Sequence, residues 1–184
     1  MSELEKAPQS NAAHGALTRK NKRLTMIVVL AMLTAMEIVL NRFVSINTWN
    51  LKIGFSFVPV VIGALLYGPL GGACVAALGD FLGAILFPIG PYFPGFTFTA
   101  LLTGLVFGLF LYRAQSPLRI VLCVAVNQLI LSLLLNSLWI SVLYGSPYLP
   151  LLGSRLLQCA ILIPVQIALI FALAPALRRL KHEL

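Results

Sequence analysis

Six long apolar segments constrain the fold of this chain more than any other feature of its sequence. They occupy residues 24–40, 53–67, 70–87, 96–112, 118–140 and 151–177, separated by stretches rich in Gly, Pro or Asn. A helix needs about 20 mainly apolar residues to cross a bilayer, and in lipid only helices and closed barrels satisfy every backbone polar group. Only 10% of the residues are charged, against about 25% in soluble domains. The sequence therefore predicts an all-α membrane protein, a six-transmembrane-helix bundle over residues 24–177.

The Lys and Arg residues predict how this bundle lies in the membrane, because short loops rich in them stay in the cytoplasm. With a cytoplasmic N terminus, ten of the 13 fall on the cytoplasmic side: Lys6, Arg19, Lys20, Lys22, Arg23, Arg113, Arg119, Arg178, Arg179 and Lys181. We therefore expect both termini to be cytoplasmic, with residues 1–23 and 178–184 forming basic tails. The net charge of +8 is then an orientation signal that favours anionic lipid near the N-terminal tail, and nucleic acid is not an expected partner.

Three cations break this charge rule and fall on the outer side. Arg42 and Lys52 flank the first external loop, and Arg155 lies near the third. Each alone could be an interfacial anchor, since long basic side chains reach water from helix ends. Convergence of all three on one face is what a site for a carboxylate-bearing ligand would require. The loop between the first two adds amides and an indole: Asn47, Trp49 and Asn50.

The second external loop, residues 87–96, is rich in aromatic residues and proline. It contains four aromatic side chains and three prolines. Phe93 and Phe96 could form a rigid stacking platform for a flat ring, with Thr97 next to it in the sequence. The alternative is an aromatic belt at the membrane interface.

Two carboxylates lie inside the apolar segments, where an unpaired charge is costly. Asp80 shares a helical face with small residues at spacings of three and four, so a ligand could approach and donate N–H groups to it. The alternative is a structural Asp that hydrogen-bonds to neighbouring helices. We expect Glu37 to be structural, paired inside the bundle with a basic residue such as Arg42. A polar stripe in the fifth segment is predicted to face the interior: Gln128, Ser132, Asn136 and Trp139.

Motifs of catalysis and metal binding are absent from the sequence. There is no G-x-x-x-x-G-K-[ST] loop for ATP. His14 and His182 lie in the polar tails, so neither a histidine metal site nor a histidine base is expected. The three cysteines lie in apolar segments without metal-ligand spacing. We therefore predict that the chain is not an enzyme and that it has no catalytic residues, no metal and no cofactor.

Several short motifs extend over nearly the whole chain from residue 24 onward. They are Ala31-Met32-Leu33-Thr34-Ala35, Trp49-Asn50-Leu51-Lys52-Ile53-Gly54-Phe55-Ser56-Phe57-Val58-Pro59, Tyr67-Gly68-Pro69-Leu70-Gly71-Gly72, Gly79-Asp80, Phe87-Pro88 and Tyr92-Phe93-Pro94-Gly95-Phe96-Thr97. Together they resemble the substrate-capture S-components of energy-coupling-factor (ECF) transporters, and most closely the folate-specific branch of that family.

This resemblance implies six helices, high-affinity binding of a vitamin near the outer face, and gating by the loop after the first helix. It also implies that the chain docks on a membrane coupling subunit through Ala31 and Ala35, a small-xxx-small pair of the kind that permits close helix contact. Two separate ATPase subunits would supply the energy. The chain would then be the folate-binding subunit of an ECF-type ABC transporter in the cell membrane.

The ligand that suits the sequence is folate, which combines a flat pterin, an aromatic linker and a glutamate with two carboxylates. The residues predicted to bind it are Arg42, Asn47, Trp49, Asn50, Lys52, Asp80, Phe93, Phe96, Thr97, Asn136 and Arg155. Alternatives remain open at this point. The chain could bind another vitamin, it could be a stand-alone secondary transporter of an organic anion, or it could be an assembly subunit without a ligand.

Overall fold

The chain folds as a bundle of long helices. The computed structural model describes residues 7–47 and 52–183, with side chains described at 21–45 and 54–177. Its elements are α1 (Ala7–Arg42), β1 (Ile46–Asn47), β2 (Lys52–Ile53), α2 (Phe57–Leu86), α3 (Pro94–Leu111), α4 (Pro117–Ala125), the π-helical η1 (Val126–Leu135), α5 (Asn136–Tyr144) and α6 (Tyr148–Glu183). Within the described ranges, five helical segments are long and apolar enough to cross a membrane. The predicted helical membrane architecture is thus confirmed, and the second and third predicted segments share α2.

Helix α2 is broken at Gly68. This glycine has φ 79° and ψ −164°, and Pro69 follows it inside the helix; a positive φ favours glycine, and proline has no backbone N–H for the helical ladder. In an unbroken helix, Ala64 and Gly72 would lie about 12 Å apart along the axis. Instead, a methyl group on Gly72 would lie 2.8 Å from the Cβ of Ala64. The chain therefore reverses at Gly68, and the two halves of α2 pack against each other.

Small residues also bring α2 and α3 together. A methyl group on Gly104 of α3 would clash with the backbone carbonyl of Gly72, so the two helix backbones nearly touch. The hydrophobic effect does not drive helices together within lipid, and they commonly associate instead through close packing at small residues. Fully buried apolar side chains such as Val75 and Phe107 fill the adjoining core.

Local sequence signals set several helix ends. Helices α3 and α4 begin with Pro94 and Pro117, at the position where a missing N–H costs no helical hydrogen bond. The Ser116 hydroxyl caps α4 by accepting a hydrogen bond of 3.4 Å from the Arg119 amide. Gly145 follows the last residue of α5 with a left-handed φ of 64°, as is common after a helix.

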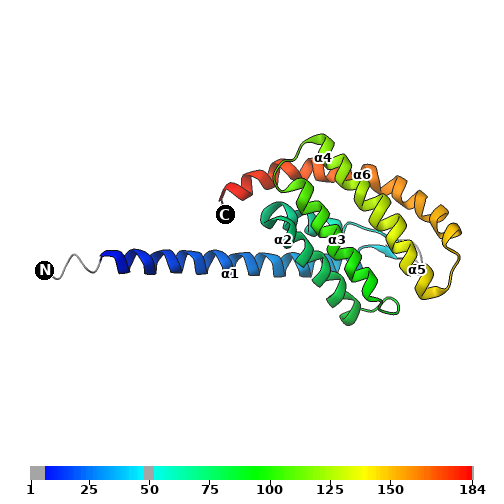
Figure 1. Cartoon of the computed structure of the whole chain (residues 1–184), viewed down its shortest axis with the longest axis horizontal. Coiled ribbons are helices and arrows are strands. Elements are labelled where there is room, and N and C mark those ends of the chain that lie inside the picture. The colour runs from blue at the N-terminus through cyan, green and yellow to red at the C-terminus, as the bar shows by residue number, and fades with distance from the viewer. Residues whose placement is uncertain (1–6, 48–51, 184) are drawn as a thin grey trace.

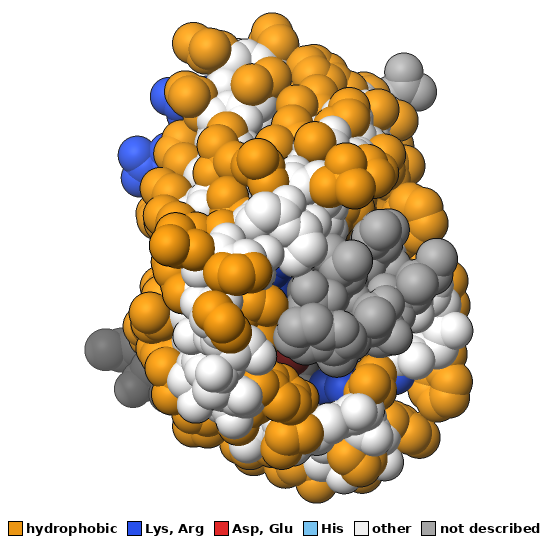
Figure 2. Space-filling model, turned by 90° about the vertical axis from the view of Figure 1, so that its right-hand side faces the viewer, with side chains coloured by type: hydrophobic (Ala, Val, Ile, Leu, Met, Phe, Trp, Pro, Cys, Tyr) orange, Lys and Arg blue, Asp and Glu red, His pale blue; other side chains and the backbone are white. Residues whose placement is uncertain are grey.

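The outer surface of the bundle is apolar. Large hydrophobic side chains are exposed on every long helix, for example Met32, Leu70, Leu109 and Leu149, and they dominate the face in Figure 2. Monomeric soluble proteins rarely expose apolar surface on this scale. A bilayer around the helices would cover it.

The connections divide the bundle into two ends. Figure 1 shows the N-terminal end of α1 and the C-terminal end of α6 on one side, and the β1–β2 hairpin and the α5–α6 connection on the other. The hairpin pairs Ile46 with Ile53 and Asn47 with Lys52 in antiparallel register. It adds two short strands to a fold predicted to be entirely helical, and α1 begins at Ala7, well before residue 24.

Candidate ligand-binding site

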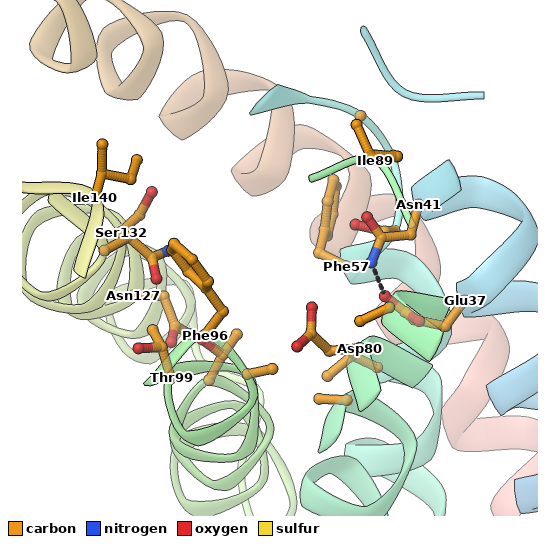
Figure 3. A pocket seen from close by; sticks show the side chains of 18 of the residues that line it. Glu37, Asn41, Phe57, Asp80, Ile89, Phe96, Thr99, Asn127, Ser132 and Ile140 are labelled. Carbon is orange, nitrogen blue, oxygen red and sulfur yellow. Dashed lines mark hydrogen bonds between the residues drawn. The ribbon is translucent and has the colours of Figure 1, made fainter. Parts of the chain in front are cut away.

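A cavity of about 630 Å³ opens within the bundle, lined by residues of α1, α2, α3, η1, α5 and α6. Figure 2 looks onto the end that carries the hairpin, where a few acidic and basic side chains are visible inside an apolar rim. Figure 3 shows two walls facing each other, with Glu37, Asn41 and Asp80 on one and Phe96 and Asn127 on the other. The volume falls in the range of ligand sites for small organic molecules, about 300–1,000 Å³.

The wall from α1 depends on two glycines of α2. Glu37 lies against Gly79, where a methyl group would collide with its carboxylate, and Arg42 lies against Gly83, where a methyl group would be 3.0 Å from its Nε. Asn41 donates a hydrogen bond of 2.7 Å from Nδ2 to Oε1 of Glu37. Glu37, expected to be structural and paired with a basic residue, therefore has Asn41 as a partner, and it also lines the cavity.

Asp80 projects from α2 into the cavity and is held from α3. The Thr97 hydroxyl donates a hydrogen bond of 2.8 Å to Asp80 Oδ2, and the Tyr92 hydroxyl lies 3.3 Å from Thr97 Oγ1. Asp80 lines the cavity, whereas Thr97 is not part of its lining. Thr97, predicted as a ligand contact, thus contacts the carboxylate in this structure.

Aromatic side chains form the next part of the wall. Phe93 and Phe96 pack edge to face, with ring centres 6.1 Å apart and planes at 75°. Phe93 also packs on Trp139, with ring centres 5.5 Å apart. The Trp139 indole N–H donates a hydrogen bond of 3.0 Å to Thr99 Oγ1, which ties α5 to α3. Phe93 and Phe96 line the cavity as a fixed aromatic surface.

The opposite wall is polar but mostly uncharged. The fifth-segment stripe contributes Gln128, Ser132 and Asn136 to the lining, as its spacing predicted. The π-helical turns of η1 also bring in Asn127, because i→i+5 hydrogen bonding places residues five apart, such as Asn127 and Ser132, on the same face. Figure 3 shows both of them on this wall.

Helix α6 supplies a polar stripe of which only the first residue, Arg155, was predicted from the sequence. Its lining residues are Arg155, Gln158, Leu162 and Gln166. The spacings of three, four and four place them on one face, and the three polar members are all buried. Two glutamines at helical spacing from an arginine, inside an otherwise apolar segment, were the signal that could have revealed this wall.

The predicted site residues are only partly brought together. Six line the cavity: Arg42, Asp80, Phe93, Phe96, Asn136 and Arg155. Asn47 and Lys52 are backbone partners in the hairpin, but their side chains lie outside the described set, and Trp49 and Asn50 lie outside the described residues altogether. Ala31 and Ala35 are exposed on α1, on the side away from the buried Thr34 and Glu37.

The cavity can bind a ligand that is both aromatic and charged. Among the described lining residues, two arginines and two carboxylates provide charge: Glu37, Arg42, Asp80 and Arg155. Arginine binds carboxylates through charge-assisted and often bidentate hydrogen bonds, and a carboxylate accepts N–H groups from a ring. Stacking on the phenylalanines would hold a flat ring between these two kinds of contact.

Known proteins share this sequence and fold. The family model for the substrate-specific component of ECF transporters matches residues 25–174. The folate transporter FolT of Clostridium novyi is 34% identical over 161 residues, which cover 87% of this chain and 94% of that protein. The folate transporter FolT of Leuconostoc mesenteroides is 33% identical over 153 residues, covering 79% and 82%.

A solved structure provides the matching three-dimensional comparison. The crystal structure of FolT bound with folic acid aligns with a TM-score of 0.78 and 31% sequence identity, covering 82% of this chain and 92% of that one. Together with the family model and the two relatives, this similarity extends over most of the helical bundle. The chain therefore belongs to the family of ECF transporter substrate-specific components.

Proposed function

We propose that this chain captures folate at the outer face of the membrane, as the substrate-specific component of an ECF transporter. The observation that carries the proposal is the cavity, in which Asp80, the Phe93–Phe96 pair and the arginines Arg42 and Arg155 line one space. The similarity to two folate transporters and to a structure bound with folic acid supports the same ligand.

Each part of folate finds suitable chemistry in this cavity. The pterin stacks against the phenylalanines, toward the bundle interior, and donates N–H groups to Asp80. The glutamate tail points outward, and Arg42 and Arg155 bind its two carboxylates through charge-assisted hydrogen bonds. The remaining proposed ligand contacts are Asn47, Trp49, Asn50, Lys52 and Asn136, and Thr97 acts indirectly by holding Asp80.

Six helical segments make up the membrane bundle in this proposal, because residues 57–67 and 69–86 each count as one, the first of them a short segment. The reversal at Gly68 supports this count, and so do the N-terminal end of α1 and the C-terminal end of α6, which lie on the same side of the bundle in Figure 1. Both termini are cytoplasmic, since most Lys and Arg residues fall on that side. The cavity then opens to the outside, with its hairpin at the outer surface.

A membrane coupling subunit and two ATPase subunits complete the proposed transporter. Ala31 and Ala35 form the contact with the coupling subunit, because their small exposed side chains allow a partner helix to approach closely. The cavity-facing side of α1 is separate from this contact, so docking leaves the ligand contacts undisturbed.

Uptake into proteoliposomes tests the division of labour between these subunits. The chain is reconstituted alone, under a proton or sodium gradient, and separately with the coupling subunit and both ATPases. We expect labelled folate to accumulate only in the second preparation and only with ATP. Gradient-driven uptake by the chain alone would instead identify a secondary transporter of an organic anion.

A further inference from the structure

The cavity continues past Asp80 and the phenylalanines toward the middle of the bundle. On α6 its lining extends from Arg155 to Gln166, which at the rise of an α-helix is roughly 16 Å along the axis. Because α6 starts at the end that carries the hairpin, Gln166 marks the inner limit of the lining on this helix. Asn127 and Gln128 line it from the middle of the neighbouring α4–η1–α5 segment.

These three amides have unused hydrogen-bonding capacity. Asn127, Gln128 and Gln166 are only 5–6% exposed, and the side-chain carbonyl oxygen of each is buried without a hydrogen-bond partner among the described residues. Asn127 Nδ2 donates a hydrogen bond to the Cys123 sulfur at 3.8 Å, and a thiol is a weak acceptor. Buried polar groups are normally satisfied, so three such amides around one cavity indicate a partner that occupies it.

The surroundings of the amides define the chemistry of that partner. Leu162 lies between Gln158 and Gln166 on the lining face of α6, and Phe107 lines the cavity from the second half of α3. The charged lining residues instead lie on α1, on α2 and at the outer end of α6. A side-chain amide offers one carbonyl acceptor and two N–H donors. Such a pocket suits a neutral, flat group whose edge carries both donors and acceptors.

We infer that Asn127, Gln128 and Gln166 form an inner subsite that binds the donor- and acceptor-bearing edge of the ligand's heterocyclic ring. This inference rests on the proposed function and adds the residues that recognise the ring. A pterin edge has N–H donors for the carbonyl oxygens and a ring carbonyl for the amide N–H groups. The arginines near the outer end bind the carboxylate tail, so ring and tail are recognised by separate residues.

Isothermal titration with two ligands tests this separation. Folate and pteroic acid share the ring and the benzoate, but pteroic acid lacks the glutamate. The variants Gln166→Leu and Asn127→Leu remove the amide and leave an apolar side chain in its place. We expect each to weaken both ligands by the same factor, about 10-fold to 100-fold, as for loss of a hydrogen bond that leaves a buried partner unsatisfied. Gel filtration and melting temperature establish that each variant is folded.

Ser137→Ala is the matched control, because Ser137 is fully buried with an unpartnered hydroxyl but does not line the cavity. It should bind both ligands like the unmodified chain. If the leucine variants lose affinity for folate but not for pteroic acid, the amides bind the glutamate tail and the inference is overturned. If their affinity for both ligands is unchanged, the amides do not contact the ligand and the inference is also overturned. Failure of the unmodified chain to bind folate would instead refute the proposed function.

Discussion

The Thr97 hydroxyl donates a hydrogen bond of 2.8 Å to Oδ2 of Asp80, and so joins the start of α3 to the second half of α2. The bond fixes the orientation of the carboxylate that lines the cavity. Tyr92, 3.3 Å from the Thr97 oxygen, extends this contact to the connection between the two helices. The only acid on the α2 wall is thus held in place by residues of the aromatic loop that the sequence marked as a ligand platform.

Asp80→Asn should weaken folate binding by about 1.5–3 kcal/mol, the usual contribution of a hydrogen bond to a charged group. Thr97→Val should cost less, about 1 kcal/mol, because it frees the carboxylate without removing it. Isothermal titration of both variants measures the two effects. Full affinity in Asp80→Asn would show that this carboxylate does not contact the ligand.

Arg42→Ala should weaken folate by about 1.5–3 kcal/mol if the guanidinium binds a ligand carboxylate, while affinity for pteroic acid stays unchanged. Arg113→Ala is the control, since Arg113 is exposed in the α3–α4 connection away from the cavity. Isothermal titration with folate and with pteroic acid measures both affinities. Unchanged folate affinity would mean that Arg42 is only an interfacial anchor, and an equal loss of affinity for both ligands would mean that Arg42 binds the ring.

Gly104→Ala should destabilise the bundle by about 1–3 kcal/mol, the typical cost of overpacking, because the new methyl group meets the backbone of Gly72. Gly153→Ala is the control in another helix, with nothing within 4 Å of the added methyl group. Thermal unfolding in detergent should show a lower melting temperature for Gly104→Ala alone. Equal melting temperatures would mean that α2 and α3 are not in close contact.

Ala31→Trp should abolish ATP-dependent folate uptake by the complete transporter and leave folate binding by the isolated chain unchanged, because the bulky ring blocks docking. Met36→Trp serves as control, since Met36 is exposed but points about 100° or more away from Ala31 and Ala35 around α1. Uptake and titration are measured for both variants. Normal uptake with Ala31→Trp would remove this surface from the proposed interface, and loss of binding would indicate misfolding.

The sequence predicted the fold well because its strongest signals are physical requirements of a bilayer. Apolar segments of sufficient length had to be helices, and Gly68-Pro69 separated two of them, as the positive φ at Gly68 explains. The short β1–β2 hairpin was not expected, since nothing in the amide-rich loop alternates over enough residues to predict strands. The π-helical η1 was also missed, because ten residues are too few to distinguish the period of i→i+5 hydrogen bonding from that of an α-helix.

The site was less predictable than the fold. Asp80 was predicted because it is a carboxylate inside an apolar segment, and Phe93 and Phe96 because they lie in an external loop rich in aromatic residues and proline. All three line the cavity. Gln158 and Gln166 were missed, although their helical spacing from Arg155 was visible in the sequence, because only the charged residue of the sixth segment was considered. The hydrogen bond between Thr97 and Asp80 depends on how α2 and α3 pack against each other, and residue spacing within one helix does not predict such packing.

Isothermal titration of the purified chain shows whether it captures folate. We expect binding in the sub-micromolar range, about −8 kcal/mol or better, for folate or for its relatives 5-formyltetrahydrofolate and methotrexate. Absence of sub-micromolar binding for all three ligands, in a sample that is monodisperse and melts cooperatively, would contradict this expectation.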